Sequence, residues 1–250
     1  MTINLPPAYV LVGGLGLRLR AVVGDRPKPL AEIGGRPFLE YLIDNLVRQG
    51  VSRMVLCTGY GGEQVARTVG SGERWGISLR IVSEAQPLGT GGAIRDAAAT
   101  TGPSDEEILV LNGDSFFDVP LVDLVAARRA ASADAAIALR RVDDTGRFGT
   151  VVVEGARVIA FREKTGKGAG FVNGGVYALR ADTLGELPAI GPASLERDLF
   201  PTLIRDANRT VIARTYEGFF VDIGIPEDYL RIRDEPPAAM VVAPSVPREC

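Results

Sequence analysis

The chain has 250 residues, of which 46% are hydrophobic and 24% are charged, and its formal net charge is −3. This composition is ordinary for a globular protein, lacks the basic excess of a general nucleic-acid binder, and contains no apolar run of the ~18 residues that a membrane span needs. The chain has no histidine and only two cysteines, which excludes Ser-His and Cys-His catalysis, histidine metal sites and a disulfide framework. We expect a cytoplasmic protein that binds neither nucleic acid nor membrane.

Predicted strands alternate with predicted helices in the first half of the chain. The hydrophobic pattern predicts strands at 8–12, 54–57, 77–82 and 108–111, and helices at 38–47, 64–69, 91–99 and 121–131. The second half changes character, because short strands dominate there. They are expected at 134–141, 150–153, 158–161, 172–179, 211–213 and 219–221, with one helix over 195–204 that Ser194 begins and another after Pro226.

The order of these elements predicts an α/β fold. We expect a Rossmann-like, doubly wound sheet that is mixed but mainly parallel, with helices on both faces. It would form one domain over 1–233, with a nucleotide-binding half at 8–131 and a second half at 132–233 that extends the sheet. Residues 234–250 contain four prolines and are expected to form a flexible tail.

The glycine-rich segment 13–16 follows the first strand, and two cations come after it, Arg18 and then Lys28 between two prolines. Glycines let backbone N–H groups approach a ligand, and a guanidinium with an ammonium suits a polyphosphate. The segment is neither a dinucleotide fingerprint, because Leu19 stands where the third glycine belongs, nor a P-loop. It predicts a nucleotide-phosphate site whose residues are Leu11, Gly13, Gly14, Gly16, Arg18 and Lys28.

Two more segments follow predicted strands, at the edge where open α/β sheets bind ligands. Segment 84–93 holds three glycines at the start of a helix, and their backbone groups suit the edge of a base. Its expected nucleotide-binding residues are Glu84, Pro87, Leu88, Gly89 and Thr90. The other segment is Asn112-Gly113-Asp114, where an apolar strand ends on a carboxylate, and Asn112 and Gly113 are expected to bind the nucleotide as well.

Asp114 and Asp222 are the candidate metal ligands. Asp222 stands in the otherwise apolar run 219–224, where an unpaired carboxylate would be costly to bury. Mg²⁺ is bound in proteins by one or two carboxylates together with phosphate oxygens. The simplest hypothesis is that the two aspartates share one Mg²⁺.

The G-G-x-G-x-R-L segment followed by R-P-K-P-L resembles the signature of sugar-1-phosphate nucleotidyltransferases, the NDP-sugar pyrophosphorylases. The resemblance covers about residues 8–232 and implies the nucleotide-diphospho-sugar transferase fold. It also implies a sugar-binding half at 132–233. The residues that it places there are Gly149 beneath the sugar, Glu163 and Asn173 at sugar hydroxyls, and Lys164 at the sugar phosphate. Leu17 departs from the family pattern, which usually has a small hydroxyl residue at that position.

The implied reaction is attack by a sugar-1-phosphate oxygen on the α-phosphorus of a nucleoside triphosphate, with pyrophosphate leaving. A phosphate monoester has a second pKa near ~6, so it is already anionic at neutral pH and needs no histidine base. Catalysis then depends on position and charge neutralisation. Arg18 would hold pyrophosphate, Lys28 the two reacting phosphates and Lys164 the sugar phosphate, with Mg²⁺ on Asp114 and Asp222.

Four segments, PLGTGGAI, VLNGDSFF, FVNGGVY and FVDIGIPEDY, are most similar to D-glycero-D-manno-heptose 1-phosphate guanylyltransferases, which favours GTP and that heptose phosphate as substrates. Mannose-1-phosphate guanylyltransferase and N-acetylmuramate-1-phosphate uridylyltransferase stay open as alternatives, because a loop of backbone groups can serve several bases. An inactive sugar-nucleotide sensor is the alternative of a different class, and the presence of Arg18, Lys28, Asp114 and Asp222 disfavours it. A homodimer is compatible with the sequence, which carries no interface signature.

Overall fold

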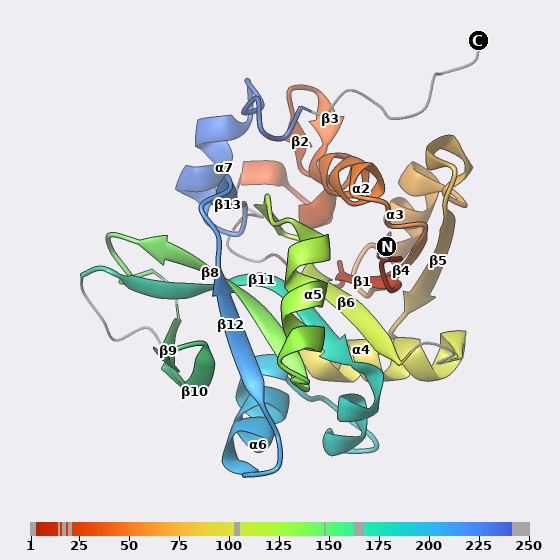
Figure 1. Ribbon diagram of the computed structural model, residues 1–250. Helices are drawn as coiled ribbons and strands as arrows, with labels where there is room; N and C mark the ends of the chain where they lie inside the picture. The colour runs from red at the N-terminus through yellow and green to blue at the C-terminus, as the bar shows by residue number, and fades with distance from the viewer. Residues whose placement is uncertain are drawn as a thin grey trace. The chain divides into compact units, whose positions relative to one another are not determined.

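The computed structural model describes residues 4–14, 16, 19, 22–102, 106–147, 149–162 and 168–241. The chain forms two compact units, each built from segments that are far apart in the sequence (Figure 1). Unit 1 contains Met1–Pro87, Asn112–Asp118 and Phe219–Cys250, and unit 2 contains Leu88–Leu111 and Val119–Gly218. This division differs from the expected halves 8–131 and 132–233, because the chain passes between the units four times.

Unit 1 contains three parallel strands, β1 (Ala8–Leu11), β4 (Arg53–Thr58) and β5 (Ser78–Ser83), in the order β5-β4-β1. Helices α2 (Phe38–Arg48) and α3 (Gly62–Val69) connect them, as the hydrophobic pattern predicted. Apolar residues three and four apart bury one side of α2. The chain turns after α2 at Gly50, whose φ of 96° is unfavourable for other residues. Shorter elements are η1 (Lys28–Leu30), β2 (Glu32–Ile33), β3 (Arg36–Pro37) and η2 (Glu73–Trp75).

A two-stranded antiparallel ribbon completes unit 1. It consists of β7 (Ser115–Phe117), which the sequence did not indicate, and β13 (Phe220–Asp222), which α7 (Pro226–Ile232) follows. Phe116 and Val221 of the ribbon are buried in a core cluster that also contains Met240, whose exposed fraction is 0%. The ring of Pro236 lies against Gly34, where a Cβ would come within 2.9 Å of it. The chain after residue 233 is therefore packed up to Met240, in contrast to the expected flexible tail, and 242–250 lie outside the described residues.

Unit 2 contains six strands, and most of their pairings are antiparallel. In spatial order they are β6 (Glu107–Asn112), β11 (Gly170–Arg180), β8 (Ala135–Val142), β12 (Val211–Thr215), β10 (Arg157–Arg162) and β9 (Thr150–Glu154). Of these neighbours, only β8 and β12 are parallel. The fold is thus mixed as predicted, but this unit is not mainly parallel. For β9 and β10 the reason is local: a two-residue turn, with Gly155 at φ 59°, joins them, and so short a connection closes only an antiparallel hairpin.

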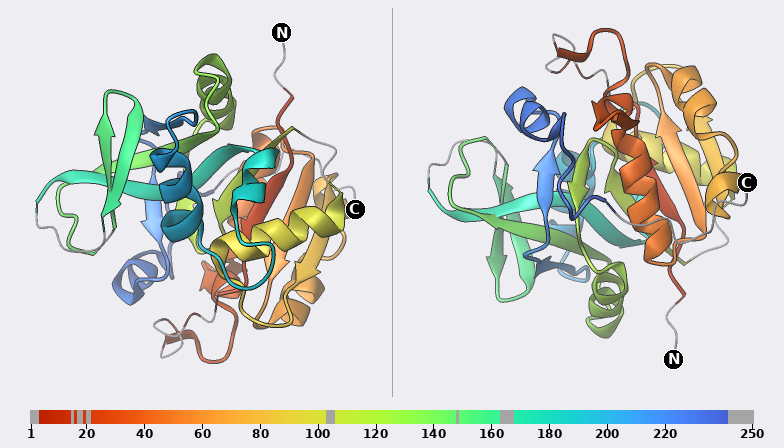
Figure 2. Two further views of the ribbon diagram at one scale, coloured as in Figure 1. Left: turned by 90° about the horizontal axis from the view of Figure 1, so that it is seen from below. Right: turned by 90° about the horizontal axis from the view of Figure 1, so that it is seen from above.

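Helices cover both faces of the unit 2 sheet. Helix α5 (Leu121–Ala130) packs on β8, β11 and β12, and α6 (Phe200–Arg205) packs on β10 and β12 from the opposite face (Figure 2). Phe200 anchors α6, because its ring stacks on Phe161 at 5.4 Å and contacts Tyr177 at 5.2 Å between centroids. The predicted helix 195–204 is a π-helical turn, η4 (Leu195–Leu199), that continues into α6. Ser194 caps it as expected, accepting the Arg197 N–H. Helix α4 (Gly89–Thr101) and the 3₁₀ segment η3 (Ala181–Glu186) complete unit 2.

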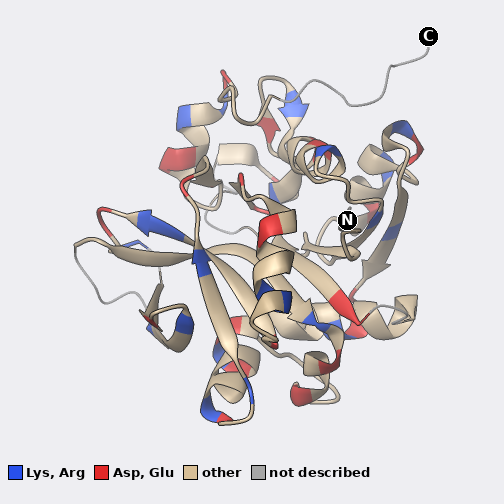
Figure 3. Ribbon diagram, viewed as in Figure 1, with Lys and Arg blue, Asp and Glu red and all other residues tan. Residues whose placement is uncertain are grey.

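Acidic and basic residues are interspersed along both units (Figure 3). Many of them form ion pairs, such as Arg214 with Asp123 at 3.0 Å. None of the helices in the described part of the chain is long and apolar enough to cross a membrane.

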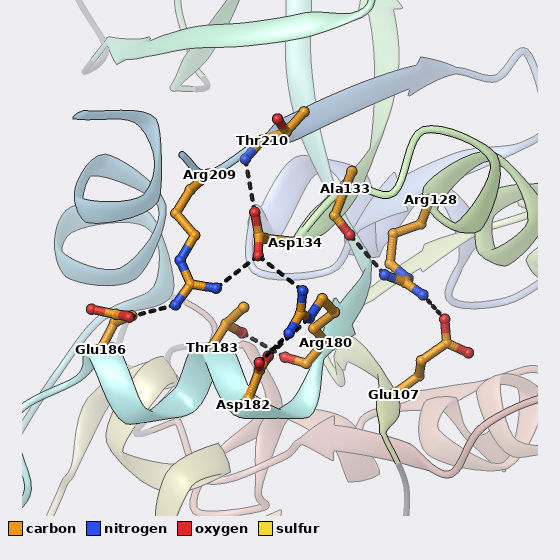
Figure 4. A network of polar contacts seen from close by, with 10 residues as sticks. All are labelled: Glu107, Arg128, Ala133, Asp134, Arg180, Asp182, Thr183, Glu186, Arg209 and Thr210. Atoms are coloured by element: carbon orange, nitrogen blue, oxygen red, sulfur yellow. Dashed lines mark hydrogen bonds and ion pairs between the residues drawn. The ribbon is translucent and has the colours of Figure 1, made fainter. Parts of the chain in front are cut away.

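A buried carboxylate joins three segments of unit 2. Asp134, which is 4% exposed, accepts hydrogen bonds from Arg209 Nη1 at 2.9 Å and from the Thr210 N–H at 2.8 Å (Figure 4). Bonding to Asp134 raises the pKa of the Arg209 guanidinium above its ordinary value, and Arg209 also bonds Glu186 at 2.8 Å. Arg180 lies 3.9 Å from the same carboxylate. The network therefore ties the start of β8 to η3 and to the loop before β12.

Replacing Asp134 with Ala should lower the free energy of unfolding by about 2–3 kcal/mol, because a buried N–H and a partly buried guanidinium lose their acceptor. Asp182→Ala is the matched control: its carboxylate is 53% exposed and pairs with Arg180, so its loss should cost less than about 1 kcal/mol. Urea denaturation of both variants measures the difference. Equal losses would contradict a structural role for the Asp134 network.

Candidate functional site

The glycines after β1 have different reasons for lacking a side chain. A Cβ on Gly13 would lie 2.9 Å from the Gly59 nitrogen and 3.1 Å from Glu84 Oε1, and Gly16 has φ 60° and packs against the Lys28 side chain. Protein packing therefore requires these two glycines. A Cβ on Gly14 would meet no atom of the described residues within 4 Å, so their packing does not require this glycine. Leu17 and Arg18 lie outside the described residues.

Lys28 is held rigidly although it stands in a short irregular segment. It opens the 3₁₀ turn η1, which Pro27 precedes, and the Pro27 ring packs so closely on Gly61 that a Cβ there would lie 2.2 Å away. The side chain of Lys28 is only 10% exposed, and its ammonium donates to Asp114 Oδ2 at 2.5 Å. The chain thus places one fixed positive charge beside the carboxylate that follows β6.

The β7–β13 ribbon brings Asp222 to the same place. Asp222 pairs in register with Ser115, and the Ile223 N–H donates to the Asp114 carbonyl at 3.0 Å. Asp222 Oδ1 accepts the Gly224 N–H at 2.7 Å. A Cβ on Gly224 would lie 2.2 Å from Lys28 Nζ and 2.8 Å from Asp222 Oδ1. The ammonium and both carboxylates therefore border one small space, which exists because residue 224 is glycine.

The donor set of this space fits Mg²⁺. The two carboxylates are hard oxygen ligands, and no cluster of three or more His, Cys, Asp or Glu side chains occurs among the residues that the structure describes. A cation bound by Asp114 and Asp222 would thus complete its shell with water and phosphate oxygens, which is the usual coordination of Mg²⁺.

Glu84 lies at the end of β5 in the same unit. Its N–H donates to the Thr58 carbonyl at 2.8 Å, and its carboxylate lies against Gly13 and Gly59, where a Cβ on Gly59 would be 2.7 Å from Oε1. Burial, together with the Glu84 charge, raises the pKa of the Cys57 thiol to about 12. The buried Cys57 is therefore no nucleophile at neutral pH.

The glycines of segment 88–92 pack against the protein itself. The N–H groups of Gly91 and Gly92 donate to the Ala193 carbonyl at 2.8 and 3.1 Å, and the Ala193 N–H donates to the Leu88 carbonyl at 2.8 Å. Gly89 has φ 70°, and a Cβ there would lie 2.5 Å from the Ala193 oxygen. The expectation that all three glycines expose backbone groups is thus wrong for Gly91 and Gly92, because a turn far along the chain uses their N–H groups. Gly113 is likewise required by packing, since its Cβ would lie 2.5 Å from Val12.

Asn173 is fixed by its own neighbours on β11. Its side-chain nitrogen donates to the Tyr177 hydroxyl at 2.7 Å, and its oxygen accepts the Gly175 N–H at 3.0 Å. The pairing of β11 with β8 shifts register between Asn173 and Tyr177, an irregularity that re-aims side chains. A Cβ on Gly149 would approach no atom closer than 3.4 Å. Glu163 and Lys164 lie outside the described residues.

Gly224 and Tyr177 contribute to these arrangements, as does Glu196, which accepts a hydrogen bond from the Tyr177 hydroxyl at 3.0 Å, and the sequence indicated none of the three. Gly224 was noted only as part of an apolar run, Tyr177 has the pattern of a core residue, and Glu196 looks like an ordinary acid in the first turn of a helix. No sequence signal marks their contacts, because each depends on segments distant along the chain.

Comparison with known families and structures identifies the relatives of the chain. Residues 8–236 match the Nucleotidyl transferase family. The chain belongs to this nucleotidyl transferase family. Over 233 residues it is 38% identical to a D-glycero-α-D-manno-heptose 1-phosphate guanylyltransferase from Aneurinibacillus thermoaerophilus, with 91% of this chain and 97% of that protein covered.

Two further matches are a sequence relative and a solved structure. A mannose-1-phosphate guanylyltransferase from Mycobacterium tuberculosis is 34% identical over 226 residues, covering 90% of this chain and 62% of that protein. A crystal structure of HddC from Yersinia pseudotuberculosis complexed with GMP-PN superposes with a TM-score of 0.81 at 31% identity, covering 92% of this chain and 99% of that one. The nucleotide-diphospho-sugar transferase fold expected from the sequence is that of these structural neighbours.

Gly224→Ala should lower the rate of nucleotidyl transfer about 10²-fold without unfolding this nucleotidyl transferase, because the new methyl group displaces the Lys28 ammonium by an ångström or more. Gly185→Ala is the control, since a Cβ there meets nothing within 4 Å. Steady-state rates and thermal melting of both variants make the measurement. A Gly224→Ala enzyme as active as Gly185→Ala would refute the steric role of this glycine.

Proposed function

We propose that the chain transfers a guanylyl group from GTP to a sugar 1-phosphate and releases pyrophosphate and the GDP-sugar. The proposed acceptor is D-glycero-D-manno-heptose 1-phosphate, the substrate named for its relatives. The observation that carries the chemistry is the space shared by Lys28, Asp114 and Asp222 beyond the glycine-rich segment. A fixed ammonium beside two carboxylates is what a polyphosphate with a divalent cation requires.

The bond formed joins an oxygen of the sugar phosphate to the α-phosphorus, and the bond broken joins that phosphorus to the leaving pyrophosphate oxygen. No protein base is needed, because the attacking phosphate is already an anion, so the protein must reduce repulsion between two anions. The Lys28 ammonium has three N–H donors and uses one on Asp114, which leaves donors for phosphate oxygens. Mg²⁺ held by Asp114 and Asp222 would neutralise further phosphate charge.

Glu84 supports guanine as the base. Guanine carries two adjacent N–H donors, on N1 and N2, and an ionised carboxylate can accept from both. Uracil presents a single N–H between two carbonyl oxygens, which a carboxylate repels. The Glu84 carboxylate borders Gly13 and Gly59 at the strand ends where such a base would bind.

Residues of unit 2 complete the proposal for the sugar. The hydrogen bonds to Tyr177 and Gly175 use one N–H and one oxygen lone pair of the Asn173 amide. Its second N–H and second lone pair suit sugar hydroxyls. Gly149, Glu163 and Lys164 are proposed for the same substrate, and Arg18 for pyrophosphate, on the family motif. Possible alternatives within this proposal are mannose 1-phosphate with GTP and N-acetylmuramate 1-phosphate with UTP.

Pyrophosphate release in the presence of Mg²⁺ tests the proposal across a substrate grid. GTP, ATP, UTP, CTP and dTTP are each paired with heptose, mannose, glucose and N-acetylmuramate 1-phosphates. We expect the highest kcat/KM for GTP with the heptose phosphate. Turnover of another pair would replace the substrates but keep the reaction, whereas nucleotide binding without any turnover would support the sensor instead.

Lys28→Met should lower kcat about 10²–10³-fold, as expected when one preorganised charge is lost from a phosphate site. The thioether keeps most of the side-chain volume, so packing against Gly16 should persist. Arg231→Ala, on an exposed part of α7, is the control for a lost surface cation. Near-normal kcat in Lys28→Met would remove this residue from the mechanism.

A further inference from the structure

A single carboxylate in unit 2 links the segment around Thr90 to Asn173. Glu196 accepts hydrogen bonds from three hydroxyls: Tyr177 to Oε1 at 3.0 Å, and Thr90 and Ser194 to Oε2 at 3.1 and 3.0 Å. Thr90 stands in the first turn of α4, in the segment whose sequence predicts nucleotide binding, and Tyr177 bonds Asn173. The carboxylate is thus the shared acceptor of two segments that are expected to bind different substrates.

The direction of these bonds follows from the chemistry of the groups. An ionised carboxylate only accepts, so the Tyr177 O–H must donate to Glu196. The Tyr177 oxygen is then left to accept, and its partner is the Asn173 amide nitrogen at 2.7 Å. That choice turns the Asn173 oxygen toward the Gly175 N–H at 3.0 Å. The Glu196 carboxylate, acting through Tyr177, and the Gly175 N–H therefore favour the same orientation of the Asn173 amide.

The same carboxylate orients Thr90. The Thr90 hydroxyl accepts the Leu195 N–H at 2.9 Å, so its hydrogen is available to donate to Glu196 at 3.1 Å. Leu195 and Glu196 belong to the π-helical turn η4, and such turns are uncommon and frequently occur at functional sites. Tyr177 is fully buried and packs on Phe200 of α6, and this packing holds its hydroxyl between Glu196 and Asn173.

We infer that Glu196 is a positioning residue for the reaction: it holds the Asn173 amide and Thr90 in one hydrogen-bonded arrangement, so that binding of the nucleotide and of the sugar phosphate favour each other. This inference rests on the proposed function. Glu196 itself touches neither substrate in this assignment, and its effect passes through Tyr177 and Thr90.

Glu196→Gln tests the inference, because the amide keeps the shape but supplies one acceptor and two donors where three hydroxyls now donate. The dissociation constant of D-glycero-D-manno-heptose 1-phosphate is measured calorimetrically with and without a non-hydrolysable GTP analogue. We expect the KM and the dissociation constant of the sugar phosphate to rise about tenfold, as for one lost charge-assisted hydrogen bond. The analogue should no longer tighten sugar-phosphate binding, whereas its own affinity in the absence of sugar should change less than threefold.

Two further variants separate positioning from a general disturbance of the turn. Tyr177→Phe breaks the link to Asn173 and keeps the link to Thr90, so it should reproduce the loss of sugar-phosphate affinity and of the coupling, and it also serves if Glu196→Gln does not fold. Asp198→Asn alters the other acid of the same turn, which accepts the Ser194 N–H at 2.7 Å, and should retain the coupling.

The outcomes distinguish this inference from the proposed function. Unchanged coupling in Glu196→Gln and Tyr177→Phe, or equal loss of coupling in Asp198→Asn, would overturn the inference while the wild-type enzyme still turns over its substrates. Absence of turnover in the wild type would overturn the proposed function. In that case the calorimetric coupling between the nucleotide and sugar phosphates still decides whether Glu196 links the two segments.

Discussion

The ion pair between Lys28 and Asp114 is the interaction on which the candidate site of unit 1 depends. Two segments 86 residues apart meet there, and their contact needs the packing around it: Pro27 on Gly61, Gly16 against the lysine side chain, and no side chain at Gly224. A Cβ on Gly224 would meet the ammonium itself, one on Gly16 would meet the Lys28 Cβ, and one on Gly61 would meet the Pro27 ring. Close packing around these glycines thus fixes the position of the Lys28 ammonium, because closely packed atoms have little room to move.

Unit 2 uses polar groups in two different ways. Around Asp134, a buried carboxylate is surrounded by arginines and a backbone N–H, so that its charge is neutralised where three segments join. Around Glu196, the partners are hydroxyls and the carboxylate is not neutralised by them. A carboxylate that accepts from a hydroxyl also sets which group donates in the next hydrogen bond, as in the bond from Asn173 to Tyr177. The first arrangement suits structural stability, and the second suits the orientation of a polar side chain such as the Asn173 amide.

Local patterns predicted most elements of the fold. Strand and helix positions from β1 to α7 follow from hydrophobic periodicity and from caps such as Ser194, and both are properties of neighbouring residues. The direction of strand pairing in unit 2 was less accessible, because it depends on how short the turns are and not on the strands themselves. The division into two units was missed for a related reason: a chain that crosses four times between units leaves no shift of composition at the crossings.

The sequence by itself determined the chemistry of the candidate site: glycines beside Lys28, two aspartates after apolar strands, and a chain without histidine that must rely on charge and position. These inferences required only residue types and their local spacing. Only the tertiary structure decided which groups meet. It placed Asp222 beside Lys28 through the β7–β13 ribbon, turned Gly91 and Gly92 toward Ala193, and joined Thr90 to Asn173 through Glu196 and Tyr177. These contacts join residues far apart along the chain, and the register of strands and turns that brings them together is set by packing of the whole unit.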